Sequence, residues 1–273
     1  MIASAALLPS LDNFKHLSSE NISEFQEKGH TLVKSVLSAV EIDAYRPVIV
    51  GAASRYNTEK RKLEDRDTYG KAFLQIMNLW QVDAAAKKFV LAKRMAKIAA
   101  ELMGVDNVRL YHDQALFKEP AGGPTPWHQD QYYWPIDTNN TVTMWMPLVD
   151  IDVDMGMLAF ASGSYKNGAV FNHEISNESD ISYTQYVKEN NFPISQAETM
   201  KAGDATWHRG FIIHQAPGNN STKLREVMTV IYVADGARVT PYNNPHQKND
   251  HHKWLMDKPI GALIDSTLNP KLL

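Results

Sequence analysis

The sequence contains no cysteine among its 273 residues, which excludes disulfide bonds, thiolate metal ligands and a cysteine nucleophile. It also has no run approaching the roughly 20 apolar residues that a membrane-spanning helix needs. The first ten residues, MIASAALLPS, include a short apolar run but no basic residue before it, so we expect no signal peptide. These absences favour a cytoplasmic protein with no membrane partner.

A marked excess of charge of one sign is also missing. The chain has 28 Lys and Arg against 31 Asp and Glu, a net charge of -3, and the two signs are interspersed. Binding to nucleic acid or to an anionic membrane would call for a basic patch, so we expect neither partner. Hydrophobic residues make up 44% of the chain, enough for a sizeable core, and nothing in the composition predicts an oligomeric state.

Helical patterns dominate residues 1–106. Periodic apolar positions predict three helices, and Gly29 and Gly104 mark the ends of the first and the last. The predicted helices span residues 18–29, 38–57 and 84–104. Between the first two, HTLVKSVL predicts a short strand.

From Val108 the sequence changes to short runs of alternating apolar and polar residues, which are typical of the strands of a sandwich or barrel. These runs are VRLYHDQALFKEP, TVTMWMPLVDI, MLAFASGS, DATWHRGFIIHQAPGNNS and REVMTVIYVAD. We expect one domain over residues 1–273, in which a mostly helical layer (1–106) precedes an antiparallel β core (107–240) and a polar tail (241–273). We also expect a partly helical insertion at 174–200 and a short helix near HHKWLMDK.

The stretch WHQDQYYW places a histidine and a carboxylate two residues apart. In a strand, His128 and Asp130 would point to the same face, roughly 6–7 Å apart at their Cα atoms, and Tyr132 and Trp134 would continue that face. Two ligands at this spacing can close on one metal ion. An isolated His-x-Asp is nevertheless more often a buried ion pair than a metal site.

A second stretch favours the metal site over the buried ion pair. His214 lies on a predicted strand that is followed by a Pro-Gly-Asn turn, and Arg225 opens the next strand eleven residues later. A His-x-Asp with one distant histidine is the ligand set of the two-histidine, one-carboxylate Fe(II) oxygenases, and it leaves positions open for a 2-oxo acid and O2. An arginine supplies the planar, permanently charged fork that binds the far carboxylate of the 2-oxo acid.

These features resemble the phytanoyl-CoA dioxygenase family of Fe(II)/2-oxoglutarate-dependent oxygenases over most of the chain. The matching segments are EFQEKGHTLVKSVLSAVEIDAYR, DQALFKEPAGGPTPWHQDQYYW, DIDVDMGMLAFASGS and GDATWHRGFIIHQAPGNNSTKLR. After the third segment many members have histidine, where this chain has Tyr165. The family fold is a double-stranded β-helix, a jelly roll related to the cupins. The resemblance therefore implies a core of this kind preceded by N-terminal helices.

Carried over residue by residue, the resemblance implies a metal site and a cosubstrate site. The implied iron ligands are His128, Asp130 and His214, and the implied clamp for 2-oxoglutarate is Arg225, assisted by Gln114. Aromatic residues of the pocket are implied at Trp134 and Trp145, although simple core packing explains each of them almost as well.

Strand parity adds independent support for a cavity wall. His112, Gln114 and Lys118 share one face of their strand, and Thr143 and Trp145 share one face of theirs. We therefore expect Thr143 and Trp145 beside the cosubstrate. We expect the substrate to contact Tyr132, Trp134 and Lys118.

Other histidines compete as ligands. His208 has the strand parity of His214 but lies seventeen residues before Arg225, against eleven in the family, and is better explained as a neighbour of the ligands or as a surface residue. His112 and Asp113 point to opposite strand faces and cannot chelate together. The remaining candidates occupy the polar tail, where solvated histidines are more common than ligands; they are His246, His251 and His252.

The implied reaction consumes 2-oxoglutarate and O2 and releases succinate and CO2. An intact Asp130 favours hydroxylation, because related halogenases have a small residue at this position; desaturation, ring formation and epimerisation stay open. The aromatic residues favour an apolar or planar substrate, such as a secondary metabolite or small acid, over an acyl-CoA. Two alternatives are a cupin-like metal enzyme that does not use 2-oxoglutarate and a catalytically silent binding barrel. Residues 57–72 and 174–200 are the expected mobile covers.

Overall fold

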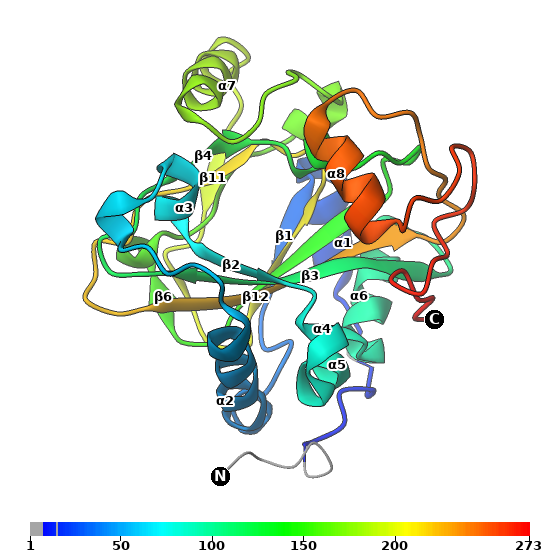
Figure 1. Ribbon diagram of the computed structural model, residues 1–273, viewed down its shortest axis with the longest axis horizontal. Helices are drawn as coiled ribbons and strands as arrows, with labels where there is room; N and C mark the ends of the chain where they lie inside the picture. The colour runs from blue at the N-terminus through cyan, green and yellow to red at the C-terminus, as the bar shows by residue number, and fades with distance from the viewer. Residues whose placement is uncertain (1–7, 15) are drawn as a thin grey trace.

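A six-stranded antiparallel sheet runs through the middle of the molecule (Figure 1). The computed structural model describes residues 8–14 and 16–273, so most of the stretch MIASAALLPS lies outside the described residues. The strand order is β1-β10-β5-β12-β3-β2. The strands are β1 (His30–Val33), β2 (Leu74–Met77), β3 (Val108–Lys118), β5 (Thr141–Pro147), β10 (Ala205–Arg209) and β12 (Arg225–Ala234).

A four-stranded antiparallel sheet, in the order β4-β11-β7-β8, and the strand pair β6-β9 complete the β structure of the described residues. Their bounds are β4 (Thr125–His128), β6 (Ile151–Asp152), β7 (Ala159–Ala161), β8 (Ile194–Gln196), β9 (Thr199–Met200) and β11 (His214–Ala216). The expected antiparallel β core with helical additions is confirmed.

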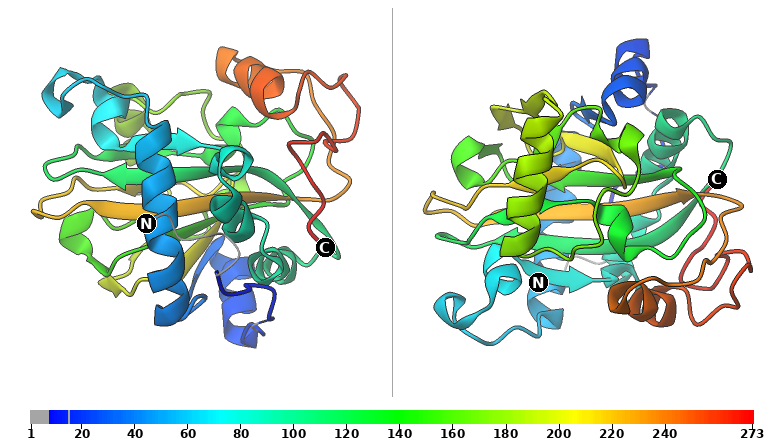
Figure 2. Two further views of the ribbon diagram at one scale, coloured as in Figure 1. Left: turned by 60° about the horizontal axis from the view of Figure 1, so that its bottom comes forward. Right: turned by 90° about the horizontal axis from the view of Figure 1, so that it is seen from above.

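Helices cover one face of the six-stranded sheet, and further helices lie around its other side (Figures 1 and 2). The helices are α1 (Ser19–Lys28), α2 (Ala39–Tyr56), α3 (Thr68–Ala72), α4 (Leu79–Val82), α5 (Ala84–Val90), α6 (Lys93–Met103), α7 (Asn177–Glu189) and α8 (Pro245–Trp254). Short 3-10 turns are η2 (Leu63–Asp65), η3 (Asp130–Tyr133), η4 (Val153–Met155) and η5 (Ser164–Asn167). Within the described residues, none of the helices has the length and apolar character that crossing a membrane demands.

The main apolar core lies between this helical layer and the sheet. Ile49 of α2, Phe89 of α5 and Ile98 of α6 are buried in one cluster with Met144 and Trp207 of the sheet. The opposite face of the same strands therefore remains available to line a site, because side chains alternate along a strand.

Local sequence signals explain where several helices begin and end. Ser38 and Glu41 form a capping box at the start of α2, and Gly29 and Gly104 adopt left-handed conformations that end α1 and α6. The single helix predicted over 84–104 is wrong, because the chain turns at Leu91 and Ala92 and forms α5 and α6 instead.

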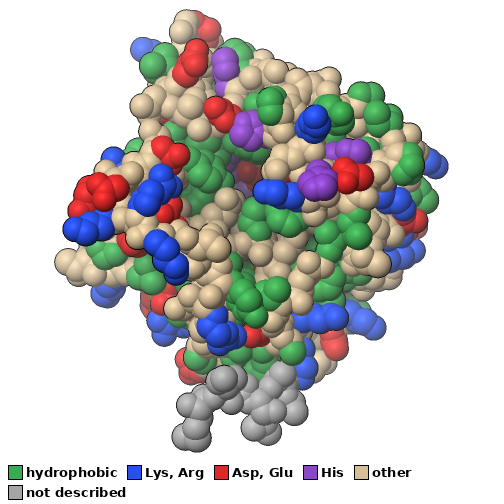
Figure 3. All heavy atoms as spheres, in the orientation of Figure 1, with side chains coloured by type: hydrophobic (Ala, Val, Ile, Leu, Met, Phe, Trp, Pro, Cys, Tyr) green, Lys and Arg blue, Asp and Glu red, His purple; other side chains and the backbone are tan. Residues whose placement is uncertain are grey.

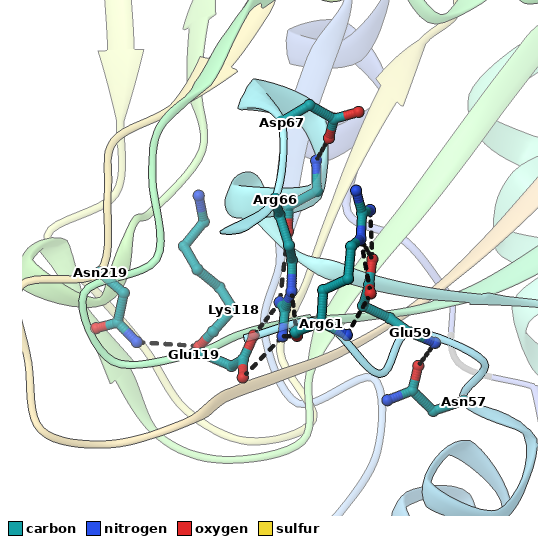
Figure 4. A network of polar contacts seen from close by, with 9 residues as sticks. Asn57, Glu59, Arg61, Arg66, Asp67, Lys118, Glu119 and Asn219 are labelled. Atoms are coloured by element: carbon teal, nitrogen blue, oxygen red, sulfur yellow. Dashed lines mark hydrogen bonds and ion pairs between the residues drawn. The ribbon is translucent and has the colours of Figure 1, made fainter. Parts of the chain in front are cut away.

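The segment before β2 is held in place by charge pairs. Arg66 is buried and forms an ion pair with Glu119 at the end of β3 (Figure 4). Its guanidinium also donates hydrogen bonds to the carbonyl of Arg61 at 3.0 and 3.1 Å. The expected cover at 57–72 thus contains ordered turns, η2 and α3, tied to the sheet. The second expected cover, 174–200, contains α7 and two short strands.

Candidate active site

Three predicted ligands converge at one end of the four-stranded sheet. His128 and His214 are directly paired on the antiparallel strands β4 and β11. The Nε2 atoms of His128 and His214 lie 3.4 and 3.7 Å from Oδ1 of Asp130, and one donor atom from each of the three residues lies within 4.8 Å of the others. Three donors at this spacing can face a single ion.

The route by which Asp130 reaches this point differs from the prediction. β4 ends at His128, and Asp130 is the first residue of the 3-10 turn η3. Strand alternation therefore does not place Asp130, and Tyr132 and Trp134 do not continue a strand face. The chain turns because Gln131 donates its backbone N–H to the carbonyl of Gly210, which folds η3 against the end of β10.

Backbone carbonyls set the orientation of both histidine rings. Nδ1 of His128 lies 2.8 Å from the carbonyl oxygen of Pro126, and Nδ1 of His214 lies 3.1 Å from that of Ile212. A carbonyl only accepts, so each Nδ1 carries the proton and each Nε2 keeps its lone pair free for a metal.

Neighbouring donors keep the Asp130 carboxylate ionised. Burial alone would raise its pKa, but the neighbouring His214, His128 and His208 hold the pKa well below its usual range. His208 Nε2 lies 3.3 Å from Oδ2, and Thr143 donates its hydroxyl to the same oxygen at 3.1 Å. His208 is therefore a buried partner of the carboxylate and not a surface residue.

Arg225 is a buried cation without an anionic partner among the described residues. It is 2% exposed, and Nη1 donates to the carbonyl of Gly156 at 2.5 Å, while Nε has no hydrogen-bond partner. The ring of Trp145 lies 5.2 Å from the guanidinium, and burial lowers the pKa of Arg225 to about 9. Such a group gains most from a carboxylate ligand, which would supply both charge and acceptors.

Gly156 allows this contact by its conformation. Its φ is +81°, and a Cβ atom built there would lie 2.6 Å from the Pro217 carbonyl oxygen and 3.3 Å from Nη1 of Arg225. Only glycine fits so close to both groups.

A cavity of about 1080 Å³ connects the triad to Arg225. Figure 3 shows the hollow on the face bordered by α3, α7 and α8, with histidine and acidic side chains in and around it. Four strand residues of the predicted parity line it, namely His112, Gln114, Thr143 and Trp145, and Thr229 of β12 lines it as well. The aromatic residues Tyr132 and Trp134 also line the cavity.

The register of the sheet orders these residues along the cavity. Thr143 and His112 flank Ile231 in one cross-strand row, and Trp145 and Gln114 flank Thr229 in the next. The Cα atom of Arg225 lies six residues before that of Ile231 on β12, roughly 20 Å away at about 3.4 Å per residue, but its side chain reaches back along the strand, and the guanidinium lies 5.2 Å from the ring of Trp145. The triad end and the arginine end of the cavity are therefore distinct.

Two predicted contacts have other partners in the structure. Gln114 Oε1 accepts a hydrogen bond from Gln75 at 2.5 Å, and Gln75 in turn accepts one from Tyr69. Lys118 is buried beside Arg225, donates to the carbonyl of Gly123, and is not among the residues that line the cavity. Burial and then the charge of Arg225 lower the pKa of Lys118 to about 6.

Several cavity residues were not predicted individually, although two of their segments overlap the expected covers at 57–72 and 174–200. They come from three segments far apart in the chain, namely Asp67–Tyr69 with Phe73, Asn172–Glu178, and the α8 residues His246, Asn249, Asp250, Lys253 and Trp254. His246, expected to be a solvated tail residue, pairs with Glu174 at 2.6 Å across the opening. No periodic signal marks these residues, because only tertiary packing brings them to the cavity.

Comparison with known proteins identifies a family and similar folds. The profile of the family described as Phytanoyl-CoA dioxygenase (PhyH) matches residues 25–227. A protein of Stutzerimonas stutzeri named "probable alpha-ketoglutarate-dependent hypophosphite dioxygenase" is 24% identical over 231 residues, which cover 80% of this chain and 79% of that protein.

Solved structures show the same fold. The non-heme alpha ketoglutarate dependent carbocyclase SnoK from nogalamycin biosynthesis has a TM-score of 0.77 at 23% identity, covering 97% of this chain and 99% of its own. The epimerase SnoN, in complex with Fe3+, alpha ketoglutarate and nogalamycin RO, has a TM-score of 0.76 at 21% identity, over 93% and 98%. EctD from S. alaskensis, with 2-oxoglutarate and 5-hydroxyectoine, has a TM-score of 0.66 at 17% identity, over 86% and 84%. The expected jelly-roll fold is confirmed.

Proposed function

The chain belongs to the phytanoyl-CoA dioxygenase family of non-haem Fe(II)/2-oxoglutarate-dependent oxygenases, and from this premise we propose that it hydroxylates an unactivated C–H bond of a small organic molecule. In this reaction one atom of O2 enters the substrate and the other enters succinate, as 2-oxoglutarate loses CO2. The observation that carries the proposal is the convergence of His128, Asp130 and His214 in one cavity with the unpaired Arg225.

We assign the iron to the three converging side chains because their donor set suits it. Two neutral imidazoles and one carboxylate are the ligands of non-haem Fe(II) sites that keep positions open for reactants. When bound, Fe(II) supplies the activation of O2 that the protein side chains cannot perform. His208 and Thr143 hold the Asp130 carboxylate by Oδ2, which leaves Oδ1 directed toward the two histidines.

We assign the far carboxylate of 2-oxoglutarate to Arg225. Its buried guanidinium has one carbonyl partner and a free Nε, so a carboxylate would complete both its charge and its hydrogen bonds. Trp145 packs against the guanidinium and would restrict it to one orientation. Thr229 and Gln114 lie in the cross-strand row between the triad and Arg225, along the path that the cosubstrate would occupy.

The size and lining of the cavity support an organic substrate. About 1080 Å³ is comparable to the largest typical ligand pockets and far exceeds what a small inorganic anion such as hypophosphite needs. Tyr132, Tyr133 and Trp134 provide aromatic surface on the substrate side. These features favour a molecule with fused or linked rings, such as a secondary metabolite.

Substrate-dependent succinate formation tests this function. The purified protein, supplied with Fe(II), 2-oxoglutarate and O2, is incubated with a panel of ring-containing small molecules, and succinate is quantified above the rate without added molecule. We expect a response to members of the panel and a product that has gained one oxygen atom by mass spectrometry. A response confined to acyl-CoA esters would contradict the substrate assignment.

The mass of the product also distinguishes the other outcomes of this chemistry. Ring formation or desaturation removes two hydrogen atoms, and epimerisation leaves the mass unchanged. Either result would contradict hydroxylation while leaving the iron and cosubstrate sites as assigned.

A further inference from the structure

We propose that the substrate carries a protonated amine beside a planar ring system, and that the carboxylate of Asp250 receives this amine at the end of the cavity away from Arg225. This inference rests on the proposed function, since it takes the cavity to be the substrate site. It goes beyond that function by naming the charge of the substrate and the residue that recognises it.

Asp250 is a buried carboxylate without a cation. It is 8% exposed and lines the cavity from α8. Its neighbours are neutral donors: the hydroxyl of Tyr111 at 3.3 Å from Oδ2, and the side chain of Trp254. No ion pair joins Asp250 to Lys253 or to any other basic residue in the part of the chain that the structure describes. A carboxylate has about four acceptor sites, so acceptor capacity remains for a ligand. Burial raises the pKa of Asp250 to about 7, and a bound cation would favour the ionised form.

The surroundings of Asp250 suit a cation attached to rings. Trp254 follows it by one helical turn, and Trp134 and Tyr132 line the same cavity. Aromatic faces attract ammonium groups and pack against planar rings.

An unpartnered imidazole lies next to this carboxylate site. His112 is 3% exposed, lines the cavity, and has no hydrogen-bond partner for Nδ1. Its ring lies 5.2 Å from Tyr111 and 5.8 Å from Trp254, the two residues that bond Asp250. A buried polar atom is normally satisfied, so His112 is a second group at this end that lacks the partner a bound molecule could supply.

The site formed by Asp250 and His112 lies on the triad side of the cavity. His112 lies in the same cross-strand row as Thr143, which bonds the ligand residue Asp130. The guanidinium of Arg225 lies 5.2 Å from the ring of Trp145, which belongs to the next cross-strand row toward the start of β12. A molecule anchored at Asp250 would therefore approach the triad from the side opposite to the cosubstrate.

The charged residues that line the substrate side are mainly acidic. Apart from the ligand Asp130 and the cosubstrate residue Arg225, the cavity is lined by four carboxylates, Asp67, Glu174, Glu178 and Asp250, and by one lysine, Lys253. The resulting field attracts cations and repels the phosphates of an acyl-CoA or a phosphorus oxyanion. Charge thus disfavours both classes, and the size of the cavity separately disfavours a small oxyanion.

Three indole probes that differ only in the charge of the side chain test the inference. Binding of tryptamine, tryptophol and indole-3-propionate to the full-length protein, loaded with Fe(II) and 2-oxoglutarate without oxygen, is measured by equilibrium dialysis. We expect tryptamine to bind about tenfold more tightly than tryptophol or better, in line with a hydrogen bond to a charged group, and indole-3-propionate to bind most weakly.

Two variants separate recognition of charge from a structural role. Asp250→Asn should reduce the tryptamine preference to within about twofold, because it keeps the shape and removes the charge. Asp257→Asn is the matched control: Asp257 is exposed, follows α8 and does not line the cavity, and its variant should keep the full preference.

The inference is overturned if tryptophol or indole-3-propionate binds as tightly as tryptamine, if none of the three binds, or if the preference survives in Asp250→Asn. Its failure is distinguishable from failure of the proposed function. Binding of 2-oxoglutarate to the Fe(II) protein does not involve Asp250, so loss of the amine preference with intact cosubstrate binding contradicts the amine alone.

Discussion

At the scale of single residues, the metal site depends on which atoms face the common point. His214 offers Nε2 there, whereas His208 uses Nε2 to contact the Asp130 carboxylate. We predict that His214→Ala loses Fe(II) binding and all coupled turnover. His208→Ala should retain iron with a loss of about 10- to 100-fold in affinity or activity, which is typical when a partner of a metal ligand is removed.

Iron content after dialysis and Fe(II) titration of both variants check this prediction. Circular dichroism serves as the control for folding. An active, iron-binding His214→Ala beside an iron-free His208→Ala would show that the ligand assignment is wrong.

Arg225 supports a second prediction, because its charge is buried and unpaired. Arg225→Met should weaken 2-oxoglutarate binding by about 2 kcal/mol or more, a loss of roughly 30-fold or greater, since truncating one partner of a buried charge pair is costly. Arg225→Lys should recover part of this loss, because it restores the charge but not the planar fork.

Thermal unfolding with and without 2-oxoglutarate provides the measurement. The wild-type protein should gain stability with added cosubstrate, and Arg225→Met should not. Equal stabilisation of both proteins would place the cosubstrate elsewhere.

Residue spacing predicted the part of the site that lies on strands. Spacing and the family resemblance brought together His128, Asp130, His214 and Arg225, and strand parity placed Thr143 and Trp145 in one cavity wall. Two details could not be predicted from the sequence, because they depend on packing between segments. Thr143 bonds Asp130 directly, and Lys118 turns away from the cavity toward Gly123.

At the scale of secondary-structure elements, Asp113 links β3 to α4. Its carboxylate accepts the backbone N–H of Leu79 at 3.0 Å and that of Trp80 at 3.4 Å. Burial nevertheless raises the pKa of Asp113 to about 7, against about 3.9 in an unfolded chain. Between these values the folded protein binds a proton that the unfolded chain does not, so stability falls as pH rises from about 4 to about 7.

We therefore predict that Asp113→Asn flattens the pH dependence of the free energy of unfolding. Denaturant titrations of the variant and wild type at about pH 5 and about pH 8 compare the two slopes. Asp43→Asn, at an exposed position of α2, should behave as wild type. An unchanged pH dependence in Asp113→Asn would show that Asp113 is ionised in the folded protein across this range.

The ion pair of Arg66 and Glu119 supports a prediction about the segment before α3. Arg66→Met removes this pair and the bonds to the Arg61 carbonyl (Figure 4). Trypsin should then cleave faster at the exposed Lys60, Arg61 and Lys62, because local opening of this segment becomes easier.

Limited proteolysis with mass spectrometry locates the cut. Asp150→Asn, which breaks an exposed pair with Lys201, is the control and should leave the cleavage rate unchanged. Equal rates for Arg66→Met and wild type would show that the pair does not restrain the segment.

Element types followed from the sequence more reliably than element ends. Alternation predicted β3, β5 and β12 closely, since apolar core residues alternate along these long strands with residues that line the cavity. The break between α5 and α6 and the end of β4 at His128 were missed, because Leu91, Ala92 and Gln129 fit either continuation. Tertiary contacts decide such positions.

At the scale of the whole molecule, the site is built by segments distant in the chain. The strands supply His128, His214 and Arg225, the turn η3 supplies Asp130, and α3, residues 172–178 and α8 surround the opening. The sequence predicted the fold class and the chemistry of the triad and Arg225, because these follow from periodicity and motif spacing. It did not predict the α8 residues on the substrate side of the cavity. Their sequence resembles a polar tail, and only the packing of α8 against η3 brings them to the cavity.

The central claim is that one chain holds Fe(II) through His128, Asp130 and His214 and 2-oxoglutarate through Arg225. The most direct test is an anaerobic titration of the Fe(II)-loaded protein with 2-oxoglutarate, followed by visible absorption. We predict a metal-to-ligand charge-transfer band that saturates at one cosubstrate per chain and requires a much higher cosubstrate concentration in Arg225→Met. A protein that binds Fe(II) but develops no such band would contradict the claim and favour a cupin-like enzyme that does not use 2-oxoglutarate.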